Sequence, residues 1–179
     1  MIRLLIVGAF LAPIWGTEKV LVSRDDALAG AFPGAAFRQE TLWPTEAQHL
    51  RAEKLAGVSI LDGPVHRWVA ERDDTIVGFA YFDRHRVRTL PETLMIAVLP
   101  NGELESIQVL HFGEPVDYLP RPRWYAQFPG RRLDDQLRLK KGIHAVTGAT
   151  LTAVAIQEGI IQRLGGGSVS LRFTDPVGV

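Results

Sequence analysis

The sequence of 179 residues contains no cysteine and has no net charge, because its 20 basic side chains are matched by 20 acidic ones. Without cysteine the chain has no disulfide framework, thiolate metal site, iron–sulfur ligation or cysteine nucleophile. A neutral chain has no global field that attracts nucleic acid, so we expect no nucleic-acid partner. The patterns G-x-x-x-x-G-K-[ST] and G-x-G-x-x-G are also missing. The sequence therefore supports neither a P-loop nor a dinucleotide-binding fold.

The first residues form an uncharged apolar segment, LLIVGAFLAPIW, which follows the positive charge of Arg3. A basic start followed by about a dozen apolar residues is typical of a secretory signal. The segment is shorter than the roughly 20 residues of a membrane-spanning helix, and a proline interrupts it. We expect residues 1–16 to be a signal peptide or a short membrane anchor, and residues 17–179 to form a periplasmic or membrane-associated domain on the extracytoplasmic face. The alternative is a buried N-terminal strand of a cytoplasmic domain.

Two helix starts precede the main block of strands. Ser23 is followed by two acidic residues, which predicts an N-cap and a helix that ends near Phe32. The sequence Thr45-Glu46-Ala47-Gln48 has the form of a capping box and predicts a second helix, ending near Gly57.

The middle of the chain is rich in strand signals. Asp73-Asp74 and Pro100-Asn101-Gly102 are typical of hairpin turns. The segment 104–109 alternates, and only its set Glu105, Ile107 and Val109 forms a mostly apolar face. These signals predict strands at 66–72, 75–87, 94–99 and 103–111.

The C-terminal part is expected to return to helix. One or two helical turns are predicted within 123–130, and a helix follows from about residue 150 to Leu164, with Gly165–Gly167 ending it. Ser168 to Phe173 alternates and predicts a last strand. A block of strands flanked by helices indicates a single α+β domain with a mainly antiparallel sheet.

The segment Thr147-Gly148-Ala149-Thr150-Leu151-Thr152 lies at a predicted loop-to-helix junction. Glycine has no Cβ and lets a ligand approach the backbone closely. The unpaired N–H groups and the positive dipole end of a helix N-terminus favour phosphate, and three threonine hydroxyls gather here. The pattern thus indicates a phosphate site with a hydroxyl nucleophile. The alternative is that the threonines are simple helix caps.

This segment resembles the flavinylation motif of the FMN-binding domain family. That family includes the C subunit of the sodium-translocating NADH:quinone oxidoreductase and the G subunit of the Rnf electron-transport complex. The resemblance extends over about residues 32–164 through Phe32-Pro33-Gly34-Ala35, through the hairpin Pro100-Asn101-Gly102-Glu103-Leu104 with Val109-Leu110-His111, and through Glu114-Pro115.

The resemblance implies an electron carrier rather than a stand-alone enzyme. FMN would be attached through its phosphate to Thr150 by a separate flavin transferase that requires Mg²⁺ and FAD. Its partners would be a membrane redox complex or other electron donors and acceptors. The resemblance places FMN-binding residues at Thr147, Gly148, Ala149, Thr150, Leu151, Thr152 and His144, and by position also at His111 and Glu114.

Two departures from the family pattern keep other functions open. The acidic residue of the motif is replaced by His144, and Val116-Asp117-Tyr118 replaces a glycine-rich continuation after Glu114-Pro115. One alternative is a flavin-free interaction module of a membrane redox complex. The other is a flavin-dependent reductase with its own substrate, although no convincing acid–base pair is visible and adjacent Asp134 and Asp135 would point apart.

A few other residues have both a functional and a structural interpretation. His111 and Glu114 have the spacing H-x-x-E, but no third or fourth ligand is near, so we expect no metal site. Trp124, Tyr125 and Phe128 could stack on an isoalloxazine ring or belong to the core. The basic run from Arg84 to Arg88 is interpreted as a solvated strand end.

Overall fold

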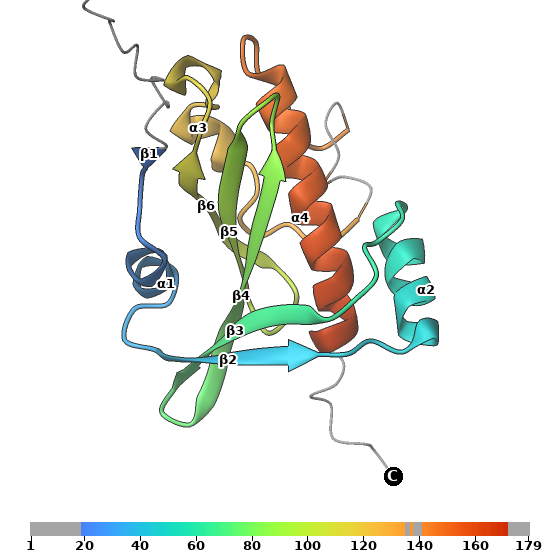
Figure 1. The fold of residues 1–179 in the computed structure, drawn as a ribbon. Coiled ribbons are helices and arrows are strands. Elements are labelled where there is room, and N and C mark those ends of the chain that lie inside the picture. Colours follow the sequence, from blue (N-terminus) through green and yellow to red (C-terminus); the bar gives the residue numbers. More distant parts are fainter. Residues whose placement is uncertain (1–18, 135–136, 138–140, 172–179) are drawn as a thin grey trace, which may run out of the picture.

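The computed structural model describes residues 19–134, 137 and 141–171 (Figure 1). One antiparallel sheet of six strands has the order β1-β6-β5-β4-β3-β2. Helix α4 covers one face and α1 the other, with α2 packed beside α4. The predicted α+β class with a mainly antiparallel sheet flanked by helices is confirmed. The strands are β1 (Lys19–Val20), β2 (Ala36–Leu42), β3 (Val65–Arg72), β4 (Thr75–Arg86), β5 (Pro91–Val98) and β6 (Leu104–Phe112).

The helices are α1 (Arg24–Ala31), α2 (Glu46–Ala56), α3 (Pro122–Tyr125) and α4 (Thr150–Leu171), with a 3₁₀ turn η1 (Val116–Tyr118). Both predicted N-caps are confirmed. The Ser23 hydroxyl accepts from the Asp26 N–H at 3.1 Å. In α2 the Gln48 N–H donates to the Thr45 hydroxyl at 3.4 Å, and the Thr45 N–H donates to Gln48 Oε1 at 2.7 Å, which completes the capping box.

Two hydrophobic clusters fill the two sides of the sheet. The α4-face cluster includes Phe79, Leu94, Ile96 and Ile156. The α1-face cluster includes Leu28, Ala80, Met95 and Ala97. Neighbouring residues of β4 and β5 alternate between the two clusters, because successive side chains of a strand point to opposite faces.

Strand β6 departs from this alternation through two register shifts. Val109 lies opposite Leu94 and His111 lies opposite Thr93, so Leu110 has no partner residue in β5. Glu105 is a second extra residue, because its neighbours Leu104 and Ser106 lie opposite Val98 and Ala97. Each bulge places two residues of β6 opposite one residue of β5, and it thereby changes which face of the sheet the following side chains point to. Leu104, Ile107, Val109 and Phe112 therefore all join the α4-face cluster, and Leu110 joins the α1-face cluster. The prediction that Glu105 shares the apolar face with Ile107 and Val109 is wrong for this reason.

The C-terminal prediction is also wrong. Helix α4 continues through Gly165–Gly167 to Leu171, where a helix end and a strand were expected. Glycine costs roughly 1 kcal/mol relative to alanine in a helix, but it keeps its N–H and does not break the helix as proline does. The remaining two residues of the predicted strand lie outside the described residues.

The N-terminal leader expected at residues 1–16 lies outside the described residues as well. Within the described part of the chain, no helix is both long enough and apolar enough to cross a membrane.

Candidate functional site

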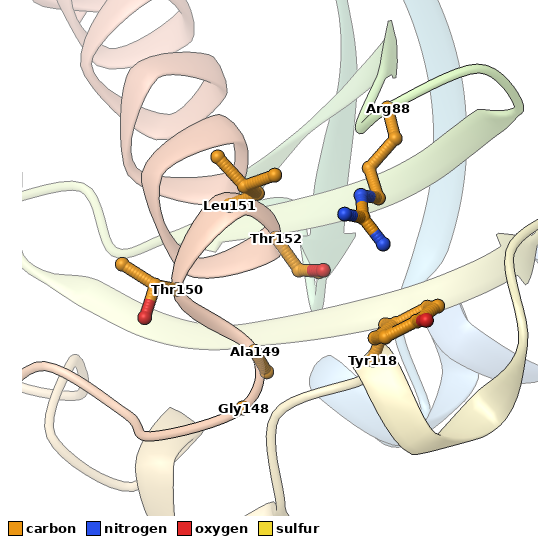
Figure 2. Close-up of a pocket in the computed structure, with 7 residues that line it drawn as sticks. All are labelled: Arg88, Tyr118, Gly148, Ala149, Thr150, Leu151 and Thr152. Atoms are coloured by element: carbon orange, nitrogen blue, oxygen red, sulfur yellow. The ribbon is translucent and has the colours of Figure 1, made fainter.

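An open pocket of about 210 Å³ lies at the N-terminus of α4 (Figure 2). Three segments that are distant in the sequence form it. Arg88 comes from the loop between β4 and β5, and Tyr118 from the end of η1. The other lining residues are consecutive: Gly148, Ala149, Thr150, Leu151 and Thr152.

The backbone at the start of α4 leaves hydrogen-bond donors open. The Ala153 N–H donates to the Ala149 carbonyl at 2.9 Å, which is the first bond of the helix. The N–H groups of the preceding residues, Thr150 to Thr152, have no carbonyl acceptor within the helix. Gly148 has φ +86° and open space where a Cβ would stand. A side chain at this position would be strained by the backbone conformation and would project into open space, so glycine is needed for the turn.

The Thr150 side chain is exposed, and its hydroxyl donates to the Val146 carbonyl at 3.0 Å. The acceptor proposed by the resemblance is thus accessible to a second protein. Leu151, the next residue, is 54% exposed at the rim of the pocket.

The Thr152 side chain differs from that of Thr150 in burial and direction. Thr152 is only 1% exposed, and Figure 2 shows its hydroxyl pointing toward the side of the pocket where Tyr118 and Arg88 lie. Thr150 points the other way, since two residues turn a helix by about 200°.

Among the described residues, the Arg88 side chain contacts an aromatic ring and forms no ion pair with an acidic residue. Its guanidinium carbon lies 4.8 Å from the centroid of the Tyr118 ring. The Glu114 carboxylate fixes the loop that carries Arg88, because it accepts from the N–H groups of Thr89 at 2.7 Å and Leu90 at 2.9 Å. These backbone hydrogen bonds lower the pKa of Glu114. Glu114 therefore orients the loop and does not itself line the pocket.

The other sequence-predicted residues lie near the pocket or apart from it. Thr147 is exposed and directly precedes the lining residues. The His144 side chain is exposed, while its backbone carbonyl accepts from Trp124 Nε1 at 2.7 Å. His111 lies in β6, opposite Val20 of β1. The structure thus brings Gly148 to Thr152 together and leaves Thr147, His144, His111 and Glu114 outside the lining.

The aromatic residues belong mainly to the core. Trp124 is 4% exposed and Phe128 is fully buried, and both are part of the α4-face cluster. The Trp124 ring makes edge contacts with Tyr125 at 5.2 Å and with Phe128 at 5.0 Å between centroids. The hypothesis that Trp124 and Phe128 stack on a flavin is wrong, because neither ring is exposed to a ligand.

Sequence reasoning missed Arg88 and Tyr118. The basic run was interpreted as a solvated strand end, and this holds for the exposed Arg84 and Arg86; Arg88 is exposed as well, and His85 is half-buried. Nothing in the local sequence distinguishes Arg88 from Arg84 and Arg86. Only the β4–β5 connection and η1 bring it to the start of α4.

A second polar cluster lies between the sheet and α4, and we call Asp83, His85, Glu92 and Arg163 the buried ionic cluster. His85 Nδ1 is 2.7 Å from Asp83 Oδ2, and His85 Nε2 is 3.0 Å from Glu92 Oε2. Arg163 Nε donates to Asp83 Oδ1 at 3.0 Å. Among the described residues, no group of histidines and acids has the arrangement of a metal site.

Protonation in the buried ionic cluster follows from these contacts. Burial disfavours the charged imidazole, but the hydrogen bonds to Asp83 and Glu92 outweigh it and raise the pKa of His85 to about 9. Burial raises the pKa of Glu92, against the effect of His85. For Asp83 the reverse holds: burial alone would raise its pKa, but the bonds to His85 and Arg163 lower it.

Comparisons with known proteins find likenesses among solved structures. No protein-family model and no curated protein matches the chain. Among solved structures the chain is similar to NqrC of Shewanella oneidensis, with a TM-score of 0.49 and 17% sequence identity over 75% of this chain and 70% of that chain.

Proposed function

We propose that this protein is an electron-transfer domain that carries FMN at the pocket of α4, with the phosphate of FMN joined to Thr150. The observation that carries the proposal is the conformation of the segment Thr147–Thr152 and the groups that it presents to the pocket. It makes an open helix N-terminus with an exposed threonine hydroxyl, a second threonine hydroxyl that faces the pocket and a nearby cation. Backbone N–H groups, hydroxyls and a cation are the groups that bind phosphate in proteins.

The residues present fit an FMN phosphate and leave the flavin ring largely outside. Pockets that enclose a whole small ligand measure roughly 300–1,000 Å³. This pocket is smaller, at about 210 Å³, and it is open beside the exposed Leu151. When bound, FMN supplies one- and two-electron redox chemistry, and a ring at the open side would be within reach of protein redox partners.

Covalent attachment would need a flavin transferase. The Thr150 oxygen attacks the FMN phosphorus of FAD, so that an oxygen–phosphorus bond forms and the pyrophosphate bond breaks. AMP leaves, and the hydroxyl proton passes to a base of the transferase. Thr150 suits this role because it is exposed, and because the Val146 carbonyl is the one partner of its hydroxyl among the described residues. A phosphoester tether would keep the cofactor on a domain that is exported or held at the extracytoplasmic membrane face.

The lining of the pocket favours a carrier over a reductase with its own substrate. No carboxylate or histidine lines it among the described residues. A substrate in the pocket would therefore have only the Tyr118 hydroxyl as a general acid among the described lining residues. We propose that its partners are redox proteins, such as a membrane complex, that donate and accept electrons.

Co-expression with a flavin transferase tests the proposal. We expect the wild-type protein to keep flavin fluorescence in a denaturing gel, and Thr150→Ala to lose all of it while folding normally. Removing the hydroxyl deletes one exposed hydrogen bond and should lower the free energy of unfolding by about 1 kcal/mol or less. Thr75→Ala, which changes an exposed threonine at the start of β4 whose hydroxyl also donates to a backbone carbonyl, is the matched control and should be labelled as wild type.

Peptide mass mapping then locates the modification. FMN on the peptide that contains Thr150, and absent from Thr150→Ala, is the expected result. A wild-type protein that stays colourless with saturating transferase would contradict the proposal and favour a flavin-free interaction module. FMN mapped to Thr147 or Thr152 would refute the attachment site.

A further inference from the structure

Strand β2 forms one edge of the sheet, and its outer side has no partner strand among the described residues. On its inner side all seven residues of β2 pair with β3 without a register shift. The backbone N–H and C=O groups that point outward are a template for another strand. Proteins often protect such an edge with a proline, a lysine or a bulge. Strand β2 has none of the three, so its edge can still pair.

The two charged residues of β2 stand symmetrically about its centre. Gln39 is the middle residue, with Arg38 before it and Glu40 after it. Glu40 Oε2 accepts from Arg67 Nε at 2.6 Å, and the Arg67 guanidinium lies 4.3 Å from the ring centroid of Phe79, a member of the α4-face cluster. Arg38 shares this face with Glu40, because residues two apart on a strand point the same way.

Ion pairs within the chain orient these two side chains and leave them accessible. Arg38 Nε donates to Glu71 Oε1 at 2.9 Å. A guanidinium has five N–H donors, and the Arg38 side chain is 48% exposed, so it has donors left for a further acceptor. The Glu40 side chain is 27% exposed and is held by the buried Arg67. The edge therefore presents one charge of each sign at fixed positions.

A second copy of β2 matches this pattern in one register. When two copies run antiparallel with Gln39 opposite Gln39, Arg38 lies opposite Glu40 of the second copy, and Glu40 lies opposite its Arg38. Side chains of one face stay together only when the register changes in steps of two residues. The two neighbouring registers of this kind place Arg38 opposite Arg38 or Glu40 opposite Glu40, and like charges directly opposite are destabilising. The charges thus select the register centred on Gln39.

An exposed aromatic side chain lies at the end of the same edge. Trp43 directly follows β2 and is 74% exposed. If the register centred on Gln39 continues beyond the strand, Trp43 lies opposite Ala35 of the second copy, on the face where Phe37 lies opposite Thr41. Tryptophan is enriched at protein interfaces, and this pairing would cover part of the ring.

We propose that two copies of this chain associate by antiparallel pairing of their β2 strands, centred on Gln39, so that the two sheets become one. Backbone hydrogen bonds would supply the affinity, and the Arg38–Glu40 pairs would set the register. Stable interfaces contain roughly 20–30 residues a side, so we expect a pair of seven-residue strands to form a reversible dimer. The start of α4 lies at the end of that helix remote from β2 (Figure 1), so the pairing leaves the pocket open.

Sedimentation equilibrium of the full chain, over about a hundredfold range of concentration, tests the proposal. We expect wild type to dimerise reversibly. Arg38→Glu should raise the dissociation constant of the dimer at least about tenfold, because both attractive cross-strand pairs become like-charge contacts. Arg84→Glu is the matched control. It makes the same change of charge at an exposed position of β4, inside the sheet, and should dimerise as wild type.

A charge exchange between two variants locates the contact. Glu40→Arg should weaken self-association as Arg38→Glu does. An equimolar mixture of the two variants should dimerise as wild type, because one edge then carries two acids and the other two arginines. Glu40→Arg also removes the partner of the buried Arg67, so circular dichroism must show that it folds. Hydrogen exchange of wild type needs no substitution: the N–H groups of residues 36–42 should exchange more slowly at high protein concentration than at low.

A wild-type protein that stays monomeric over the whole range would overturn the proposal. A dimer that Arg38→Glu and Arg84→Glu weaken equally would also overturn it. Slower exchange confined to another surface, such as that of the exposed Leu50 and Leu61 around α2, would assign the contact there and exclude β2. A mixture of two folded variants that stays monomeric would exclude the register centred on Gln39. None of these measurements involves flavin, so their outcome is independent of the proposed function.

Discussion

Strand β4 and its following loop supply residues to two polar regions that differ in how their charges are satisfied. In the buried ionic cluster, His85 lies between two carboxylates and Arg163 bonds Asp83. At the pocket, Arg88 has an aromatic ring beside it, and no carboxylate is among the described lining residues. The first region has its cations paired with anions from the chain itself, whereas the second presents a cation and open donors to a ligand.

The difference separates structural from functional polar groups. Buried charges are tolerated when they are paired and hydrogen-bonded, which explains the ion pairs under α4 by folding, whereas Glu92 Oε1 is buried there without a hydrogen-bond partner among the described residues. Unpaired donors in a pocket weaken the fold, and a bound anion reverses that cost. We therefore assign the ligand to the pocket, although the buried ionic cluster contains more titratable groups.

Removing the cation from the centre of the buried ionic cluster should have the largest effect on stability. His85→Ala leaves the carboxylates of Asp83 and Glu92 without their shared partner, and we expect the free energy of unfolding to fall by about 3 kcal/mol. Urea unfolding followed by circular dichroism measures it. Arg84→Ala, an exposed residue on the same strand, should change it by less than about 0.5 kcal/mol. If both variants unfold at the same urea concentration, the cluster is not a structural element.

The same cluster should make stability fall in mild alkali. The pKa of His85 is raised from 6.5 to about 9, so its contribution is complete below pH 6.5 and is lost as the pH rises through about 9. Asp83 acts in the opposite range, because its lowered pKa gives a contribution that is lost on acidification. Urea titrations at pH 6, 7.5 and 9 should show a decline that His85→Gln removes. A decline of the same size in His85→Gln would assign it to another group.

A substitution that changes the backbone conformation at the pocket should affect the labelling of Thr150 more than the stability of the fold. Gly148 has φ +86°, a conformation that costs an alanine about 1–2 kcal/mol. Gly148→Ala should lower the free energy of unfolding by about that amount and reduce labelling of Thr150, because the helix start would shift. Gly30→Ala is the matched control: Gly30 lies inside α1 with open space around it and no positive φ, so alanine should stabilise the protein slightly. Normal labelling of Gly148→Ala would show that the flavin transferase does not require the turn at Gly148.

His144→Asp should have the smallest effect on the fold and a selective effect on labelling. The side chain is exposed, and the contacts of residue 144 to Trp124 and Gln127 use the backbone, so stability should change by less than about 0.5 kcal/mol. A carboxylate could meet a metal or basic group of the transferase that a neutral imidazole meets only weakly. In-gel flavin fluorescence should rise with a transferase whose substrates carry aspartate in the motif. Equal labelling of both proteins by that transferase and by the chain's own would show that position 144 is not recognised.

The sequence by itself determined the parts of this protein that depend on near neighbours. Ser23 and Thr45 begin helices, and Asp73-Asp74 turns a hairpin with φ +49° and +57°, because caps and tight turns are decided within about four residues. The pocket residues Gly148 to Thr152 were predictable for the same reason, since they are consecutive and their chemistry comes from one helix start.

Only the tertiary structure determined the features that depend on contacts between segments distant in the sequence. Strand β2 has a mostly polar sequence, AFRQETL, and is a strand because it pairs with β3 at the sheet edge. The bulges of β6 are set by its register against β5, and no local pattern announces them. Arg88 and Tyr118 reach Thr152 for the same reason. Their chain neighbours give no sign of a pocket, and only the packing of the β4–β5 loop and η1 against α4 makes a cation and a buried hydroxyl face one space.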